Sequence, residues 1–120
     1  MLNGYAKDYY ETAKSKGFWD KPRNIGEMLM LITSELGEAM EAHRKGRFAN
    51  KEGFESDINK GVSLKEAFEK NIKDSFEDEL ADVLIRVFDM AGGQGVDLDY
   101  HVNIKNGYNQ QRERLHGKKY

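Results

Sequence analysis

Two pairs of acidic residues have a spacing that places both carboxylates on one side of a helix. Glu35 and Glu38 lie three positions apart, and so do Glu79 and Asp82. Residues three apart lie roughly 60° apart around a helix, so each pair shares a face. Both pairs fall at the edge of an apolar stripe, which draws them toward a partner helix rather than into water. Two facing helices would therefore bring four carboxylates together.

Four close carboxylates repel one another and raise their own pKa values unless a cation neutralises them. Mg²⁺ prefers oxygen ligands, water and substrate phosphates, and Mn²⁺ can substitute for it. We therefore expect Glu35, Glu38, Glu79 and Asp82 to hold Mg²⁺. The alternative is an ordinary solvated surface, because a single pair of this kind is common on exposed helices. A di-iron centre is rejected because it needs Glu-x-x-His on two helices, and Glu113-x-x-His116 is the only instance.

A polar face near the C-terminus could supply contacts to an anionic substrate. Lys105, Asn109 and Arg112 stand at positions i, i+4 and i+7, so they share one face of a helix. The two cations could neutralise phosphoryl oxygens, and Asn109 could donate to a phosphate or a sugar. The alternative is a solvated helix end whose basic residues complement the helix dipole. Trp19, the single tryptophan, could stack on a base or could be a core residue.

Helical periodicity positions these residues in an all-α, four-helix-bundle-like fold. Capping residues at Asn24, Ser63 and Asp97 are expected to start three of the helices. A loop excursion over residues 47–62 and a short extra helix separate the two acidic helices. The expected helices cover residues 5–16, 25–45, 64–72, 76–91 and 98–115, with glycines at 17, 46 and 92–93 as stops.

Length and composition limit the number of domains, the kinds of metal site and the partners that the chain could have. With 120 residues the chain is expected to form a single domain, residues 1–120, and without cysteine it can form neither disulfides nor a thiolate metal site. The net charge of −2 favours no polymeric nucleic-acid partner. The sequence shows neither a signal peptide nor a membrane span, so a cytoplasmic location is expected.

The three motifs in this order resemble the MazG-like all-α nucleoside triphosphate pyrophosphatases. They are Glu35-x-x-Glu38, Glu79-x-x-Asp82 and Lys105-x-x-x-Asn109-x-x-Arg112. The segment from Phe18 to Ile25 looks like the approach to the first metal helix in the dCTP pyrophosphatase branch. The resemblance covers about residues 18–112. Two features depart from it: the long 47–62 excursion, and Ser34 where many members have another acid.

The resemblance implies Mg²⁺-dependent hydrolysis of a (deoxy)nucleoside triphosphate to the monophosphate and pyrophosphate, in a homodimer or dimer of dimers. It implies that the four acids are metal ligands and that Glu35 or Glu38 also orients the attacking water. It further implies nucleotide and phosphate contacts from Lys105, Asn109 and Arg112. A rival interpretation is a non-enzymatic helical interaction module with a salt-bridged acidic surface. Another is a phosphohydrolase that releases orthophosphate.

Overall fold

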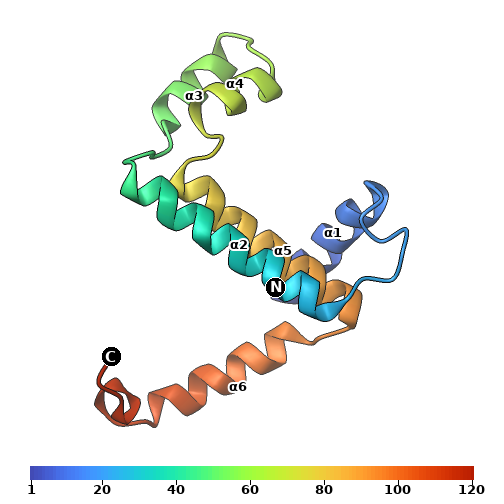
Figure 1. Ribbon diagram of the computed structural model, residues 1–120, viewed down its shortest axis with the longest axis vertical. Coiled ribbons are helices and arrows are strands. Elements are labelled where there is room, and N and C mark those ends of the chain that lie inside the picture. The colour runs from blue at the N-terminus through green and yellow to red at the C-terminus, as the bar shows by residue number, and fades with distance from the viewer. The chain divides into compact units, whose positions relative to one another are not determined.

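Helices account for the whole architecture of the chain (Figure 1). The computed structural model describes all 120 residues and contains no strand, which confirms the all-α class. The elements are α1 (Leu2–Ser15), α2 (Ile25–Arg44), α3 (Lys51–Asn59), α4 (Leu64–Asn71), α5 (Phe76–Gln94), α6 (Leu98–Gln110) and a 3₁₀ turn (Arg114–Gly117). None of the helices is long and apolar enough to cross a membrane.

Side-chain caps start the helices where the sequence predicts them. The side chains of Asn24, Ser63 and Asp97 accept backbone N–H groups at the starts of α2, α4 and α6, over 3.1, 3.2 and 3.1 Å. These bonds satisfy donors that a helix start otherwise leaves without a partner. Gly46 follows α2 with a φ of 68°, a left-handed conformation that glycine adopts without strain.

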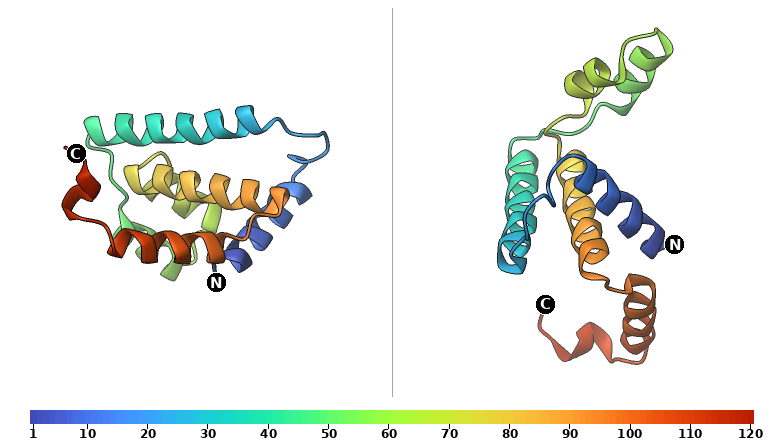
Figure 2. Two further views of the ribbon diagram at one scale, coloured as in Figure 1. Left: turned by 90° about the horizontal axis from the view of Figure 1, so that it is seen from below. Right: turned by 90° about the vertical axis from the view of Figure 1, so that its right-hand side faces the viewer.

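The chain divides into two compact units. We call residues Lys21–Val87 the acidic unit, and Met1–Asp20 together with Phe88–Tyr120 the terminal unit. In the acidic unit, α2 and the first part of α5 run antiparallel and side by side (Figures 1 and 2). Helices α3 and α4 pack on each other as a hairpin. This hairpin is inserted between the end of α2 and the start of α5.

The buried side of α2 is turned away from the centre of the predicted apolar stripe. The stripe centres near Ile25 and Leu36, but these side chains are 50% and 49% exposed. The buried positions are instead Met28, Glu35, Ala39 and Ala42, which lie roughly 80° further round the helix. The expectation that the stripe faces the interior therefore holds for the side that carries Met28 and Ala39 and is wrong for the side that carries Ile25 and Leu36. Glu35, beside the buried side, is itself buried.

The predicted loop over residues 47–62 is also wrong, because α3 lies within it. Asn50 caps this helix by accepting the Gly53 N–H group over 2.9 Å. A Cβ at Gly53 would lie only 2.5 Å from Asn71 Oδ1 in α4, so the glycine permits close packing rather than ending the helix. Asn71 also donates to Asp57 over 2.9 Å. Capping and packing on α4 thus outweigh the low helix propensity of glycine.

In the terminal unit, α5 continues through the predicted stop at Gly92 and Gly93 as far as Gln94. A Cβ at Gly92 would lie 2.5 Å from the Ala6 carbonyl oxygen, and one at Gly93 would overlap the Trp19 ring. Both glycines therefore serve close packing inside a helix. Helix α6 ends at Gln110, earlier than predicted, so Arg112 lies just beyond the helix instead of on its face.

Candidate metal centre

Three of the four predicted metal ligands come together between α2 and α5. One carboxylate oxygen from each of Glu35, Glu79 and Asp82 lies within 4.8 Å of the others. Glu35 and Glu79 are buried, with 8% and 4% of their surfaces exposed, and Asp82 is partly exposed. Glu35 projects from the buried side of α2, and the other two occupy neighbouring turns of α5. The whole cluster lies within the acidic unit.

Two buried oxygens in this cluster have no hydrogen-bond donor. They are Glu35 Oε2 and Glu79 Oε2. A buried polar atom without a partner costs about 1–3 kcal/mol, and more if it is charged. Folding therefore places acceptors at this position without supplying the donors that would satisfy them. A proton or a cation would remove this cost.

The electrostatics of the cluster favour protonation when no cation is bound. Burial, together with contacts to the Glu35 and Glu38 carboxyls, raises the pKa of Glu79 to about 8. Burial and the nearby charges of Asp78 and Glu35 raise the pKa of Asp82 to about 6. A divalent cation would stabilise the charged forms and displace the proton, as at other oxygen-ligand sites. The donor set therefore fits a hard cation such as Mg²⁺.

Glu38, the fourth predicted ligand, lies beside Glu79 but outside the three-residue cluster. Its side chain is exposed, and its carboxyl contacts that of Glu79 closely enough to raise the pKa of Glu79. Glu38 also lines a pocket of about 280 Å³ together with Glu41, Arg47, Asp74 and Glu79. Glu38 therefore borders the site on its open side.

A second acidic group adjoins the first through Glu79. Oxygens of Asp74, Asp78 and Glu79 lie within 4.8 Å of one another. Asp78 accepts the Asp74 N–H group over 3.0 Å, so part of its capacity is used by the backbone. Asp74 and Asp78 were not among the predicted metal ligands.

Arg86 is the residue of the site that the sequence analysis missed. Its Nε atom donates to Glu35 Oε1 over 2.9 Å, and the side chains of both residues are mostly buried. The available signal was a polar line that begins at Ser75, just before α5, and continues along the helix through Glu79, Asp82 and Arg86 at alternating intervals of four and three residues. Such a line places all four on one face of the helix.

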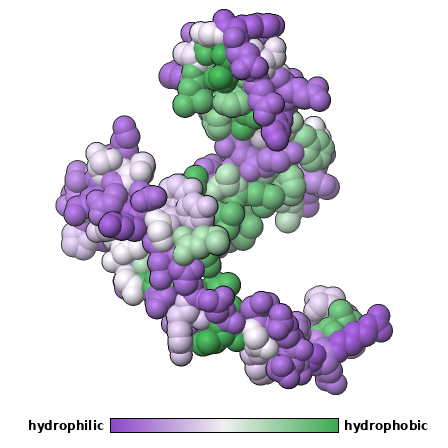
Figure 3. Space-filling model, turned by 180° about the vertical axis from the view of Figure 1, so that it is seen from behind, coloured by the Kyte–Doolittle hydropathy of each residue, from purple (hydrophilic) through white to green (hydrophobic).

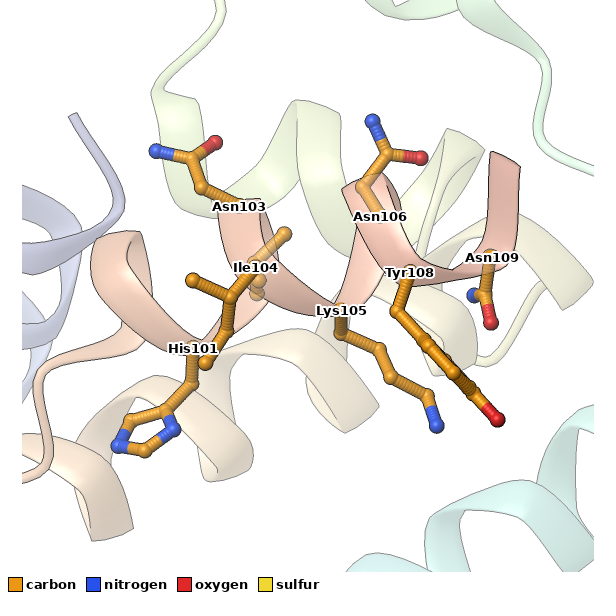
Figure 4. A pocket seen from close by; sticks show the side chains of 8 residues that line it. His101, Asn103, Ile104, Lys105, Asn106, Tyr108 and Asn109 are labelled. Carbon is orange, nitrogen blue, oxygen red and sulfur yellow. The ribbon is translucent and has the colours of Figure 1, made fainter. Parts of the chain in front are cut away.

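The predicted nucleotide-binding residues belong to the terminal unit. Lys105 and Asn109 lie on α6, where they line an open pocket formed by this helix (Figure 4). The Lys105 ammonium lies 5.3 Å from the centre of the Tyr108 ring, and the Arg112 guanidinium lies at the same distance. Arg112 also donates to the His116 carbonyl over 3.1 Å. Both predicted cations thus contact the same ring, Tyr108.

Trp19 is held in the terminal unit by polar and aromatic contacts. Its indole N–H donates to Asp89 over 2.7 Å. Tyr10 contacts the ring edge to face, with 5.1 Å between the ring centres. The ring also packs against Gly93. These contacts fix the orientation of the ring, and part of its surface stays exposed.

Comparison with protein-family models, with curated proteins and with solved structures gives no match for this chain.

Proposed function

We propose that this protein hydrolyses a (deoxy)nucleoside triphosphate to the monophosphate and pyrophosphate with the help of Mg²⁺, as in the MazG-like family that its motifs resemble. The observation that carries the proposal is the meeting of Glu35, Glu79 and Asp82 around two buried oxygens without donors. A salt-bridged acidic surface would not need such atoms, because surface carboxylates are satisfied by water. A cation site, in contrast, needs carboxylate oxygens that are not already used by hydrogen-bond donors of the protein.

The residues divide into groups with different tasks. Glu35, Glu79 and Asp82 would hold Mg²⁺, with Glu38 completing the set from the open side. A bound Mg²⁺ lowers the pKa of water and neutralises phosphoryl charge. Arg86 holds one oxygen of Glu35 and so orients its carboxylate. Glu38 is exposed and lies next to Glu79, so in this proposal it would orient a water molecule and accept its proton.

The reaction itself needs positioning and charge neutralisation rather than a covalent intermediate. The oxygen of water forms a bond to the α-phosphorus, and the bond from that phosphorus to the oxygen bridging to the β-phosphorus breaks. Pyrophosphate leaves with the bridging oxygen, and the proton released by water passes to Glu38 and then to solvent. Mn²⁺ is expected to replace Mg²⁺ because it also accepts carboxylate ligands.

The nucleotide itself would be bound by residues of the terminal unit. Lys105 and Arg112 each contact the Tyr108 ring, and we propose that both cations bind phosphate. Asn109 Oδ1 is buried without a donor, so this amide has an acceptor available for a donor on the ligand. Trp19 presents part of an oriented ring on which a base could stack.

We further propose that the protein assembles with itself, as a homodimer or a dimer of dimers. Hydrophobic residues reach the surface of the acidic unit (Figure 3). The half-exposed apolar side chains of α2 and α5 include Ile25, Leu29, Met30, Leu36, Met40, Leu80, Leu84 and Ile85. Monomeric proteins seldom expose so extensive an apolar surface. A second copy would cover it and complete a four-helix bundle, in which α2 and α5 of each copy take part.

Product analysis by phosphorus NMR tests the proposed activity. The protein is incubated with Mg²⁺ and a panel of ribonucleoside and deoxyribonucleoside triphosphates, with a chelator in a parallel sample. We expect matched pyrophosphate and monophosphate signals for at least one nucleotide, and none with the chelator. Release of orthophosphate would establish the rival phosphohydrolase. An absence of any product across the panel would favour the non-enzymatic interaction module.

A further inference from the structure

A small pocket opens beside the metal cluster, where α2 ends and α5 begins. Its walls are formed by Glu38, Glu41, Arg47, Asp74 and Glu79, and its volume is about 280 Å³. Pockets for complete small molecules usually measure roughly 300–1,000 Å³. This pocket therefore fits one end of a ligand, such as a phosphate group, rather than a whole nucleotide. Arg47 is the only cationic residue in its walls.

The backbone of Arg47 is held by both helices that carry the metal cluster. Its N–H donates to the Ala42 carbonyl of α2 over 2.8 Å, and its carbonyl accepts the Phe76 N–H of α5 over 2.8 Å. Gly46, with its left-handed backbone, turns the chain out of α2 immediately before this residue. The position of Arg47 relative to Glu38 and Glu79 is therefore set by the same elements that position those acids.

The guanidinium of Arg47 makes no ion pair, although four acids share the pocket with it. The neighbouring Lys45 does pair, with Glu41 over 3.1 Å. Arginine binds phosphate through two parallel hydrogen bonds. The hydrogen bond from Lys45 lowers the pKa of Glu41, and the Arg47 charge contributes to this shift, but the Arg47 side chain makes no hydrogen bond within the protein, so its donors remain for a ligand. The acids would repel a bare anion, so an anion should enter this pocket only when a divalent cation is bound.

We propose that Arg47 is a phosphate-binding residue, and that it contacts the pyrophosphate portion of the substrate and of the product when Mg²⁺ is bound. This inference rests on the proposed function, because the cation held by Glu35, Glu79 and Asp82 must first offset the negative charge of the pocket. It adds a phosphate contact within the acidic unit, independent of Lys105 and Arg112 in the terminal unit.

The test uses inorganic pyrophosphate as the probe, measured by calorimetry with and without Mg²⁺. Three variants are compared with the parent protein: Arg47→Ala, Arg47→Lys and, as a matched control, Arg44→Ala. Arg44 ends α2 three positions earlier and does not line the pocket. Mn²⁺ binding in the absence of phosphate, the melting temperature, and KM and kcat for the preferred nucleotide are measured for each.

We expect Arg47→Ala to weaken Mg²⁺-dependent pyrophosphate binding by at least about tenfold and to raise KM, with Mn²⁺ binding and melting temperature close to those of the parent. Arg47→Lys should retain part of the affinity because it keeps the charge, and Arg44→Ala should match the parent. The inference is overturned if Arg47→Ala behaves like Arg44→Ala, or if it changes only the melting temperature. If the parent binds Mn²⁺ but not pyrophosphate, the inference alone fails. If the parent binds neither, the proposed function fails with it.

Discussion

Arg86 Nε donates to Glu35 Oε1 over 2.9 Å, and the second oxygen of Glu35 remains buried without a donor. Arg86 and Glu35 come from α5 and α2, so their ion pair links the two helices at the metal cluster. One oxygen of Glu35 is thus held by the protein while the other stays open to a cation. We infer that Arg86 is a positioning residue, which directs Glu35 without itself contacting a ligand.

Arg86→Ala should destabilise the metal-free protein by about 1–3 kcal/mol, because Glu35 then has no donor for either oxygen. The deficit should shrink when Mn²⁺ is added, since the cation replaces the lost positive charge. Urea unfolding with and without Mn²⁺ measures both effects. The control is Lys65→Ala, which breaks the exposed pair with Glu69 and should cost under about 0.5 kcal/mol. Equal losses in the two variants would contradict the positioning role.

The stability of the metal-free protein should fall as the pH rises. Glu79 has an ordinary pKa of 4.5 and a folded-state pKa of about 8, so between these values the folded protein binds more protons than the unfolded chain. The free energy of unfolding is therefore highest below about pH 4.5 as far as this group is concerned, and decreases toward pH 8. Asp82 adds a similar loss between its ordinary value of 3.8 and about 6.

Chemical unfolding in the presence of a chelator, from about pH 5 to about pH 8, should show a loss on the order of 2 kcal/mol. Glu79→Gln should flatten the curve, because the amide cannot titrate. A saturating concentration of Mn²⁺ should reverse the slope, since metal binds more tightly once the carboxyls are ionised. A metal-free stability that increases over this range would show that the cluster is not held in the way described.

Gly93→Ala tests the packing that carries α5 through its two glycines. The new methyl group would overlap the Trp19 ring, so we expect a loss of about 1–3 kcal/mol in the free energy of unfolding and altered tryptophan fluorescence. Gly4→Ala is the matched control, because a Cβ there meets no atom within 4 Å. That variant should gain about 0.5–1 kcal/mol from its helix propensity. Stabilisation by both substitutions would refute the close contact.

Self-association is tested by light scattering of the parent and two charged variants. The parent should have at least twice the chain mass of 13.8 kDa at micromolar concentration. Leu84→Glu, on the half-exposed face of α5, should produce monomers, because a charge cannot be buried there without a partner. Leu64→Glu, at an exposed position of α4, should leave the assembly intact. A monomeric parent would remove the proposed interface.

Local signals were sufficient to predict much of the fold. The caps at Asn24, Ser63 and Asp97 act within a few residues of the chain, and the structure has each of them. Gly92 and Gly93 misled the prediction because they resemble a helix stop, and Gly53 lies in a segment that was predicted to be a loop. Their role depends on Asn71, Ala6 and Trp19, which are distant in the sequence. Propensity alone cannot distinguish a glycine that ends a helix from one that admits a neighbour.

The acids of the site were selected from their spacing, but their environment depends on how the helices face each other. The apolar periodicity of α2 predicted that Ile25 and Leu36 would be buried. In the structure these two side chains are about half exposed, and Glu35 is buried. Several large apolar side chains of α2 and α5, such as Leu36 and Leu84, remain about half exposed, whereas Met28 is buried. Only part of the apolar stripe therefore packs within the chain. The ion pair between Arg86 and Glu35 likewise depends on the register of α2 and α5. The sequence of either helix alone does not determine that register.

Calorimetric titration with Mg²⁺ and Mn²⁺ near pH 7 tests most directly whether Glu35, Glu79 and Asp82 form a cation site. Repeating the titration in buffers of different ionisation enthalpy counts the protons released. We predict saturable binding of either metal with release of a proton from Glu79. In Glu79→Gln we expect affinity to fall by about tenfold or more and the proton release to disappear. Failure of the parent to bind either metal, or unchanged affinity and proton release in Glu79→Gln, would contradict the account.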